Sequence, residues 1–182
     1  MTLLQSILLG IVQGLTELLP ISSSAHLVLV PYLLNWDLPE TSQFLFDVLV
    51  QMGTFIAVFI YFWSDIVAII KAVVTGLLHK QPFGTVEARL GWLLVLATIP
   101  AGLLGLLVKD QVEAAFNSPS ATAAFLFLTA LLLVVAELIG KRRRPLESMN
   151  WLDALIMGLF QGLSIFPGVS RSGSTMAGGM AR

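Results

Sequence analysis

The hydrophobic pattern of this chain is dominated by three long apolar segments separated by polar loops. They cover residues 44–63, 90–108 and 121–139. Each is close to the length of about 20 helical residues that crosses the hydrocarbon core of a bilayer. We therefore predict three transmembrane helices within residues 44–139. The stretch DIVAIIKAVVTGLL after the first segment predicts a further helix, which either lies along the membrane interface or lengthens the first span.

Two shorter apolar segments, residues 1–34 and 151–182, are each interrupted by a proline and a run of hydroxyl side chains. The first contains PISSSAH and the second PGVSRSGS. Each has only about a dozen apolar residues before the break, which is too short for a full span. Irregular backbone at membrane depth is tolerated only where protein or a wet cavity satisfies its polar groups. We predict two re-entrant helix–loop–helix hairpins whose tips meet near the middle of the membrane.

The two interrupted segments are copies of one sequence. GIVQGLTELLPISSSAH aligns without gaps with GLFQGLSIFPGVSRSGS, which pairs Gly10 with Gly158 and Ser22 with Ser170. Three predicted spans lie between the copies, so the second copy enters the membrane from the opposite side. The sequence predicts an all-α polytopic protein with an inverted-topology repeat. Residues 1–182 form one membrane domain, and residues 151–182 begin a second repeat that is incomplete.

Composition and charge agree with a membrane protein and exclude several other classes. With 57% hydrophobic and 12% charged residues, polar side chains cannot cover the apolar surface in water. A net charge of −1 gives no sign of nucleic-acid binding, and the absence of cysteine excludes disulfides and thiolate chemistry. Lysine and arginine gather in loops 64–89 and 140–150, so we expect these loops to face the cytoplasm. The run KRRR at 141–144 is interpreted as a topology anchor rather than a lipid-headgroup site.

Two further patterns predict how the helices face one another. Gly10 and Gly14 are one helical turn apart and predict a face that packs closely against another helix. Asp47, Gln51 and Thr54 form a polar stripe on the first span, which should face the interior of the bundle. Whether this stripe touches a ligand or supports the hairpin tips is open.

The first interrupted segment carries a candidate anion site. Ser22, Ser23 and Ser24 fall at the start of a helix, where free backbone N–H groups, hydroxyls and the helix dipole suit an anion. Capping of a buried helix end is the alternative explanation. Glu17 shares a helix face with Gln13, and a carboxylate inside the bilayer costs at least about 2.5 kcal/mol, so it normally has a partner or a function. A carboxylate beside an anion suggests a bridging divalent cation, Mg²⁺ or another such as Ca²⁺.

The second interrupted segment supplies a cation for the same site. Arg171 lies between Ser170 and Ser172, and a guanidinium is well shaped to bind phosphate oxygens. The alternatives are that Arg171 reaches a lipid headgroup or forms a purely structural ion pair with Glu17. His26, on the first turn of its helix, is a candidate general acid or base, and a packing role is its alternative.

With these residues assembled, the chain resembles the bacterial undecaprenyl-diphosphate phosphatases of the bacitracin-resistance type. QGLTELLPISSSAH looks like the first motif of that family and PGVSRSGST like the second. The resemblance implies removal of a phosphate from the polyprenyl carrier lipid of cell-wall synthesis, with a divalent metal, in the bacterial plasma membrane and at a site open to the outer face. It implies a metal-holding and catalytic role for Glu17, a nucleophile at Ser23, proton transfer by His26 and charge stabilisation by Arg171. Gln13, Ser22, Ser24, Ser170 and Ser172 would bind the substrate.

The chain departs from that family in two respects. Gln13 is the neutral option at the first position of the motif, so a metal shared by two carboxylates is not expected. Members of the family also continue for several more helices, and we expect this chain to be a C-terminally truncated part of such a protein. Its oligomeric state is open, and a homodimer is one option.

Several mechanisms and one other class of function fit the same residues. Attack by water, with Ser23 only binding phosphate, competes with a phosphoserine intermediate. Phosphohistidine at His26 ranks third, because Ala177 stands where the lipid phosphatases of the acid-phosphatase superfamily carry a further histidine. A secondary transporter or flippase for polyprenyl phosphate or another small anion is the alternative function, since re-entrant helices around an anion site are typical of transporters.

Overall fold

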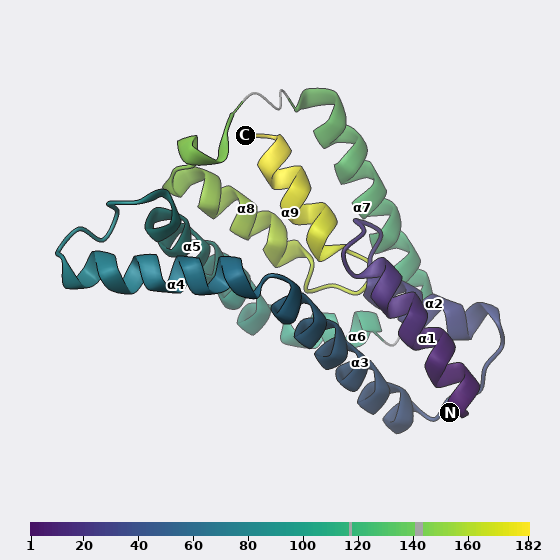
Figure 1. Ribbon diagram of the computed structural model, residues 1–182. Coiled ribbons are helices and arrows are strands. Elements are labelled where there is room, and N and C mark those ends of the chain that lie inside the picture. Colours follow the sequence, from purple (N-terminus) through teal and green to yellow (C-terminus); the bar gives the residue numbers. More distant parts are fainter. Residues whose placement is uncertain (117, 141–143) are drawn as a thin grey trace.

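The computed structural model describes residues 1–116, 118–140 and 144–182, and this part of the chain is all-helical, as predicted (Figure 1). Lys141, Arg142 and Arg143 of the predicted topology anchor lie outside the described residues. The elements, in chain order, are α1 (Leu3–Thr16), α2 (Ser23–Leu33), α3 (Glu40–Tyr61), α4 (Trp63–Leu78), α5 (Val86–Leu107), α6 (Lys109–Phe116), α7 (Pro119–Ile139), the 3₁₀ turn η1 (Leu146–Ser148), α8 (Trp151–Leu163) and α9 (Arg171–Met180).

Three of these helices are long and apolar enough to cross a membrane, which confirms the three predicted spans. They are Gln43–Tyr61 within α3, Val86–Leu107 in α5 and Pro119–Ile139 in α7. Thr85 and Ser118 cap the last two by accepting a backbone N–H in the first turn, which satisfies donors that a helix start leaves unpaired. The helix predicted after the first span is α4, a separate helix that turns away from α3 at Phe62 and packs along α5 (Figure 1).

Large hydrophobic side chains lie mainly on the outside of the molecule, and the interior combines a few of them, such as Leu9 and Leu27, with many small and polar residues. Phe44 and Phe127, for example, are 72% and 73% exposed. Buried positions include several alanines and the hydroxyl groups of Thr122 and Thr129. This distribution fits a lipid environment, where apolar side chains face the lipid and small residues allow helix backbones to approach one another.

The two copies of the repeated sequence form helix–turn–helix units with the same cap. In the first, Ser22 accepts the backbone N–H of Ala25 at the start of α2; in the second, Ser170 accepts that of Gly173 at the start of α9. The hydroxyl of each capping serine also contacts that of the serine two residues later, at 3.2 and 3.1 Å. The leading helices α1 and α8 have 14 and 13 residues, which gives lengths of about 20 Å against a hydrocarbon core of about 30 Å.

The repeated glycines are used differently in the two copies. A side chain at Gly158 would collide with the backbone carbonyl of Ala97, so α8 lies in close contact with α5. Around Gly10 and Gly14, no atom stands within 4 Å of where a side chain would begin. These two glycines line an open apolar groove of about 770 Å³ between α1 and α3. The prediction of close packing at Gly10 and Gly14 is therefore wrong for this chain, although it describes the second copy.

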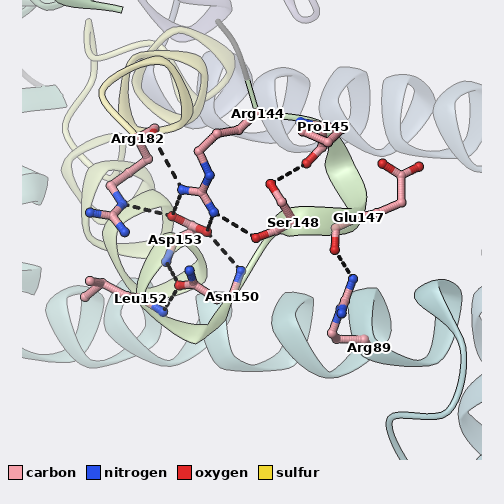
Figure 2. Close-up of polar contacts among 9 residues, drawn as sticks. All are labelled: Arg89, Arg144, Pro145, Glu147, Ser148, Asn150, Leu152, Asp153 and Arg182. Carbon is pink, nitrogen blue, oxygen red and sulfur yellow. Dashed lines mark hydrogen bonds and ion pairs between the residues drawn. The ribbon is translucent and has the colours of Figure 1, made fainter. Parts of the chain in front are cut away.

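A buried carboxylate joins the two ends of the α8–α9 unit (Figure 2). Asp153, in the first turn of α8, is 3% exposed and accepts both guanidinium arms of Arg144 at 2.8 and 2.7 Å. It also accepts Arg182, just past the end of α9, at 2.8 Å and the backbone N–H of Asn150 at 2.9 Å. These contacts show that α8 begins and α9 ends on the same side of the unit.

The loops predicted to share one side of the membrane also meet here. The guanidinium of Arg89, at the start of α5, donates to the backbone carbonyl of Glu147 (Figure 2). Loops 64–89 and 140–150 are thus in direct contact.

The contacts of Asp153 lower its pKa. Hydrogen bonds from Arg144 are the main reason that the pKa of Asp153 is held well below its usual range, with Arg182 and Asn150 adding to the effect and burial opposing it.

Asp153→Asn should destabilise the protein at neutral pH, because two guanidinium groups lose their charged acceptor. We expect a loss of about 1–3 kcal/mol, seen as a lower midpoint of thermal unfolding in detergent. A depressed pKa stabilises the folded state above the unfolded value of about 3.9, and this contribution is lost as the pH falls through the folded value. The difference between wild type and variant should therefore shrink below about pH 4. Glu147→Gln, an exposed carboxylate in the same loop, is the control and should change little.

The repeated glycines supply a matched pair of substitutions. Gly158→Ala should destabilise this 182-residue chain by about 1–3 kcal/mol, because α8 and α5 must move apart. Gly10→Ala should be neutral or stabilising by up to about 1 kcal/mol, because the added methyl group meets open space and alanine favours a helix. Thermal unfolding of the two variants side by side tests whether the two glycines are packed differently. Equal losses of stability in the two variants would contradict this difference.

Candidate functional site

The turns of the two helix–turn–helix units lie against each other. Ser172, in the first turn of α9, donates its hydroxyl to the backbone carbonyl of Leu19 at 3.1 Å, across 153 positions of sequence. A side chain at Gly173 would begin 3.2 Å from the carbonyl oxygen of Pro20, so the backbones themselves are close. The structure thus brings the two serine-rich motifs together at one place.

A polar pocket of about 180 Å³ lies at this contact. Its lining comes from both turns, from the facing side of α3 and from the end of α6, and consists of Glu17, Ser22, Ser23, Ser24, Gln51, Phe116, Ser164, Ile165, Val169, Ser170 and Arg171. Six of the nine candidate residues proposed from the sequence are in this set. The other three, Gln13, His26 and Ser172, lie beside the pocket without lining it.

The carboxylate of Glu17 organises the first turn. Its Oε2 atom accepts the hydroxyl of Ser23 at 2.6 Å and the side-chain amide of Gln13 at 2.8 Å. Its Oε1 atom is 4.0 Å from Nη1 of Arg171, which is at the limit of an ion pair. A short bond from a hydroxyl to a carboxylate is the arrangement in which the carboxylate can take the proton of a nucleophile.

The backbone of the first turn is strained where the serines begin. Ser22 has a φ of 64°, a left-handed conformation that side-chain-bearing residues rarely adopt, and it is 3% exposed.

His26 is held by a hydrogen bond to the same turn. Its Nδ1 atom donates to the carbonyl of Ser22 at 2.7 Å, since a carbonyl can only accept. This bond leaves Nε2 of His26 as the ring atom able to exchange a proton. The contact nearest to the Ser23 hydroxyl is Glu17 and not His26.

Arg171 projects from the start of α9 with its guanidinium largely open. Its side chain is 68% exposed, whereas that of Glu17 is 22% exposed. Glu17 is the one carboxylate among the residues that line the pocket. The arrangement can therefore receive an anionic group between the serine hydroxyls of α2 and the guanidinium of Arg171.

The residues beside Glu17 fit an oxygen-coordinated cation. The Oε1 atom of Gln13 is buried, and no donor among the described residues satisfies it. Amide and carboxylate oxygens are ligands that Mg²⁺ and Ca²⁺ accept. Among the described residues there is no group of three or more histidine or acidic side chains that could enclose a metal on their own. A cation here would depend on one carboxylate, one amide and oxygens from its ligand or from water.

Five pocket residues lie outside the candidate set. Two of them, Ile165 and Val169, are apolar residues of the second turn, and the other three are Gln51, Ser164 and Phe116. Gln51 belongs to the polar stripe predicted on the first span, and that stripe was its signal; Gln51 lines the pocket, although it is exposed rather than buried in the bundle. Ser164 is the counterpart of Thr16 in the repeat and could have been found by extending the alignment to hydroxyl residues. Phe116 had no signal, because it reaches the pocket through the position of the short helix α6.

Comparison with known proteins confirms the family resemblance predicted from the two motifs. The sequence model of the family described as bacitracin resistance protein BacA matches residues 6–182. The chain is 45% identical over 187 aligned positions to an undecaprenyl-diphosphatase of Chloroherpeton thalassium, covering 99% of this chain and 65% of that protein. Proteins of the same name from Myxococcus xanthus and Chlorobaculum tepidum are 44% and 46% identical over 100% of this chain, which covers 60% and 66% of their lengths. The chain thus spans just under two thirds of these relatives, and it belongs to the bacitracin resistance protein BacA family.

Proposed function

We propose that this protein removes the terminal phosphate of undecaprenyl diphosphate, releasing undecaprenyl phosphate and inorganic phosphate. The observation that carries the proposal is the 2.6 Å bond from the Ser23 hydroxyl to Glu17, in a polar pocket that Arg171 also lines. A nucleophile, a base and a guanidinium in one pocket are the parts that phosphoryl transfer requires. The names of the relatives support the choice of lipid.

In this mechanism Ser23 Oγ attacks the terminal phosphorus while Glu17 takes its proton. The bond from that phosphorus to the bridging oxygen breaks, and the polyprenyl monophosphate leaves. Arg171 balances the charge that develops on the phosphoryl oxygens, and the N–H groups at the start of α2 bind the diphosphate. Water then hydrolyses the phosphoserine and restores Ser23, with Nε2 of His26 as the candidate to exchange the proton.

Glu17, which lines the pocket, and Gln13, which lies beside it, are the residues that would hold a divalent cation. Glu17 offers a carboxylate and Gln13 a buried amide oxygen that lacks a donor among the described residues. When bound, such a cation would neutralise charge on the diphosphate. The residues of the chain would still have to hold the diphosphate in line with the Ser23 hydroxyl.

The proposed setting is the plasma membrane of a bacterium, with the pocket open to the outer face. The loops that meet at Arg89 and Glu147 carry much of the positive charge and would face the cytoplasm. Turnover on the outer face would return the carrier lipid after it has delivered its cell-wall unit.

Ser23→Ala should remove turnover while leaving lipid binding nearly intact. We expect phosphate release from undecaprenyl diphosphate in lipid nanodiscs to fall by about 10²–10⁴-fold, because the nucleophile is lost. Ser6→Ala, in α1 and away from the pocket, is the control and should keep full activity. Substantial turnover by Ser23→Ala would instead favour direct attack by water. No release by a folded, full-length wild type would sink the phosphatase proposal and favour a transporter or flippase.

Removal of divalent cations should stop the same reaction. Chelation is expected to abolish phosphate release, and Mg²⁺ or Ca²⁺ should restore it. Gln13→Glu, which adds a second carboxylate, should lower the cation concentration needed for half-maximal activity, because a second charge strengthens cation binding. Release that is unchanged in chelator would show that the pocket works with Arg171 and the helix N-terminus alone.

A further inference from the structure

The second turn, residues 164–170, rests on the backbone of α7. Gly168 has a φ of 103°, and a side chain there would collide with the carbonyl oxygen of Thr122. Phe166 stacks on Phe125 with ring centroids 5.0 Å apart. The turn therefore needs glycine both for its backbone conformation and for its close approach to α7.

One side chain of α7, that of Thr129, holds this turn by hydrogen bonds. The hydroxyl of Thr129 donates to the carbonyl of Gly168 at 2.9 Å and accepts the backbone N–H of Ser170 at 3.0 Å. A second acceptor, the carbonyl of Phe125, is farther away at 3.3 Å. Thr129 is 2% exposed, so no water replaces these bonds. Without the hydroxyl, two backbone groups of the turn would be buried and unpaired.

The fastened residues lie directly before Arg171. Ser170 is the cap of α9 and accepts the N–H of Gly173, and Arg171 is the first residue of that helix. The guanidinium of Arg171 lies 4.0 Å from the carboxylate of Glu17, and the Arg171 side chain is 68% exposed. Side-chain contacts therefore hold Arg171 only weakly, and its position is set mainly by the backbone from which it projects.

We propose that Thr129 is a positioning residue, which holds the turn before Arg171 so that the guanidinium faces the phosphoryl group. The expected effect on kcat rests on the proposed function, whereas the expected effect on the turn does not. Thr129 touches neither the pocket nor Arg171 and acts through Gly168 and Ser170 alone. A misplaced guanidinium stabilises the charge of the transition state less well but still helps to bind the substrate. Loss of the Thr129 hydroxyl should therefore lower kcat much more than it changes KM.

The chain supplies a matched control on the same helix. Thr122 is as buried as Thr129, at 0% exposed, but its hydroxyl has no hydrogen-bond partner among the described residues. Thr122→Val and Thr129→Val therefore make the same chemical change at equal burial, and only one of them removes a link to the turn. Thr129→Ser keeps the hydroxyl and should restore the wild-type behaviour.

The experiment compares these three variants with wild type, using the protein at the length that its gene encodes, in nanodiscs. Hydrogen exchange of the amides of residues 168–173 reports the turn, and phosphate release gives kcat and KM. Thr129→Val should raise exchange at Ser170 by about 10-fold or more, which is the effect of losing one net hydrogen bond. It should lower kcat by about 10–100-fold with a much smaller change in KM. Thr122→Val and Thr129→Ser should match wild type in both measurements.

Equal kcat in the two valine variants would overturn the proposal, and so would unchanged exchange at Ser170 in Thr129→Val. A loss of kcat that Thr129→Ser does not restore would also overturn it, because the hydroxyl would then not be the cause. If wild type releases no phosphate, the proposed function has failed and exchange alone decides whether Thr129 holds the turn.

Discussion

The structure depends on one constraint, which is that the backbone groups left open at a break between two helices must find hydrogen-bond partners within the protein. Both copies of the repeat are broken in this way, and both solve part of the problem locally, through Ser22 and Ser170 at the starts of α2 and α9. The remaining groups need help from elsewhere. In the second turn that help is Thr129 from α7. In the first turn the carbonyl of Leu19, which already accepts the N–H of Ile21, also accepts the hydroxyl of Ser172. Each turn is therefore completed by another part of the chain.

This mutual support explains why the pocket lies between the turns and why its functional groups come from both copies of the repeat. The first copy supplies the carboxylate and the hydroxyls, and the second supplies the guanidinium. The same cap in both copies gives two helix N-termini beside one pocket, and each N-terminus favours an anion. An anionic ligand is therefore favoured by the folding of the turns, before any charged side chain is considered.

The spans and the two motifs were predictable because they depend on local sequence, namely on runs of apolar residues and on hydroxyls that follow a proline. Features that depend on a distant neighbour were not. Spacing alone could not show that Gly158 meets Ala97 whereas Gly10 meets open space. Asp153 gave no signal, because its partners Arg144 and Arg182 approach it only once α8 and α9 have folded back. The inverted topology and the roles of the candidate residues stay predictions.

The distance between Glu17 and Arg171 bears on what the pocket is built to hold. A purely structural ion pair should close to a direct hydrogen bond, because two charges withdrawn from water are costly unless they meet with good geometry. Arg144 and Asp153 do so at 2.7 Å, and they join two segments firmly. Arg171 and Glu17 stand 4.0 Å apart, with the carboxylate already engaged by Ser23 and Gln13. Within the described residues, the guanidinium of Arg171 therefore keeps donors that no hydrogen bond uses, which is the condition for binding an anion from outside.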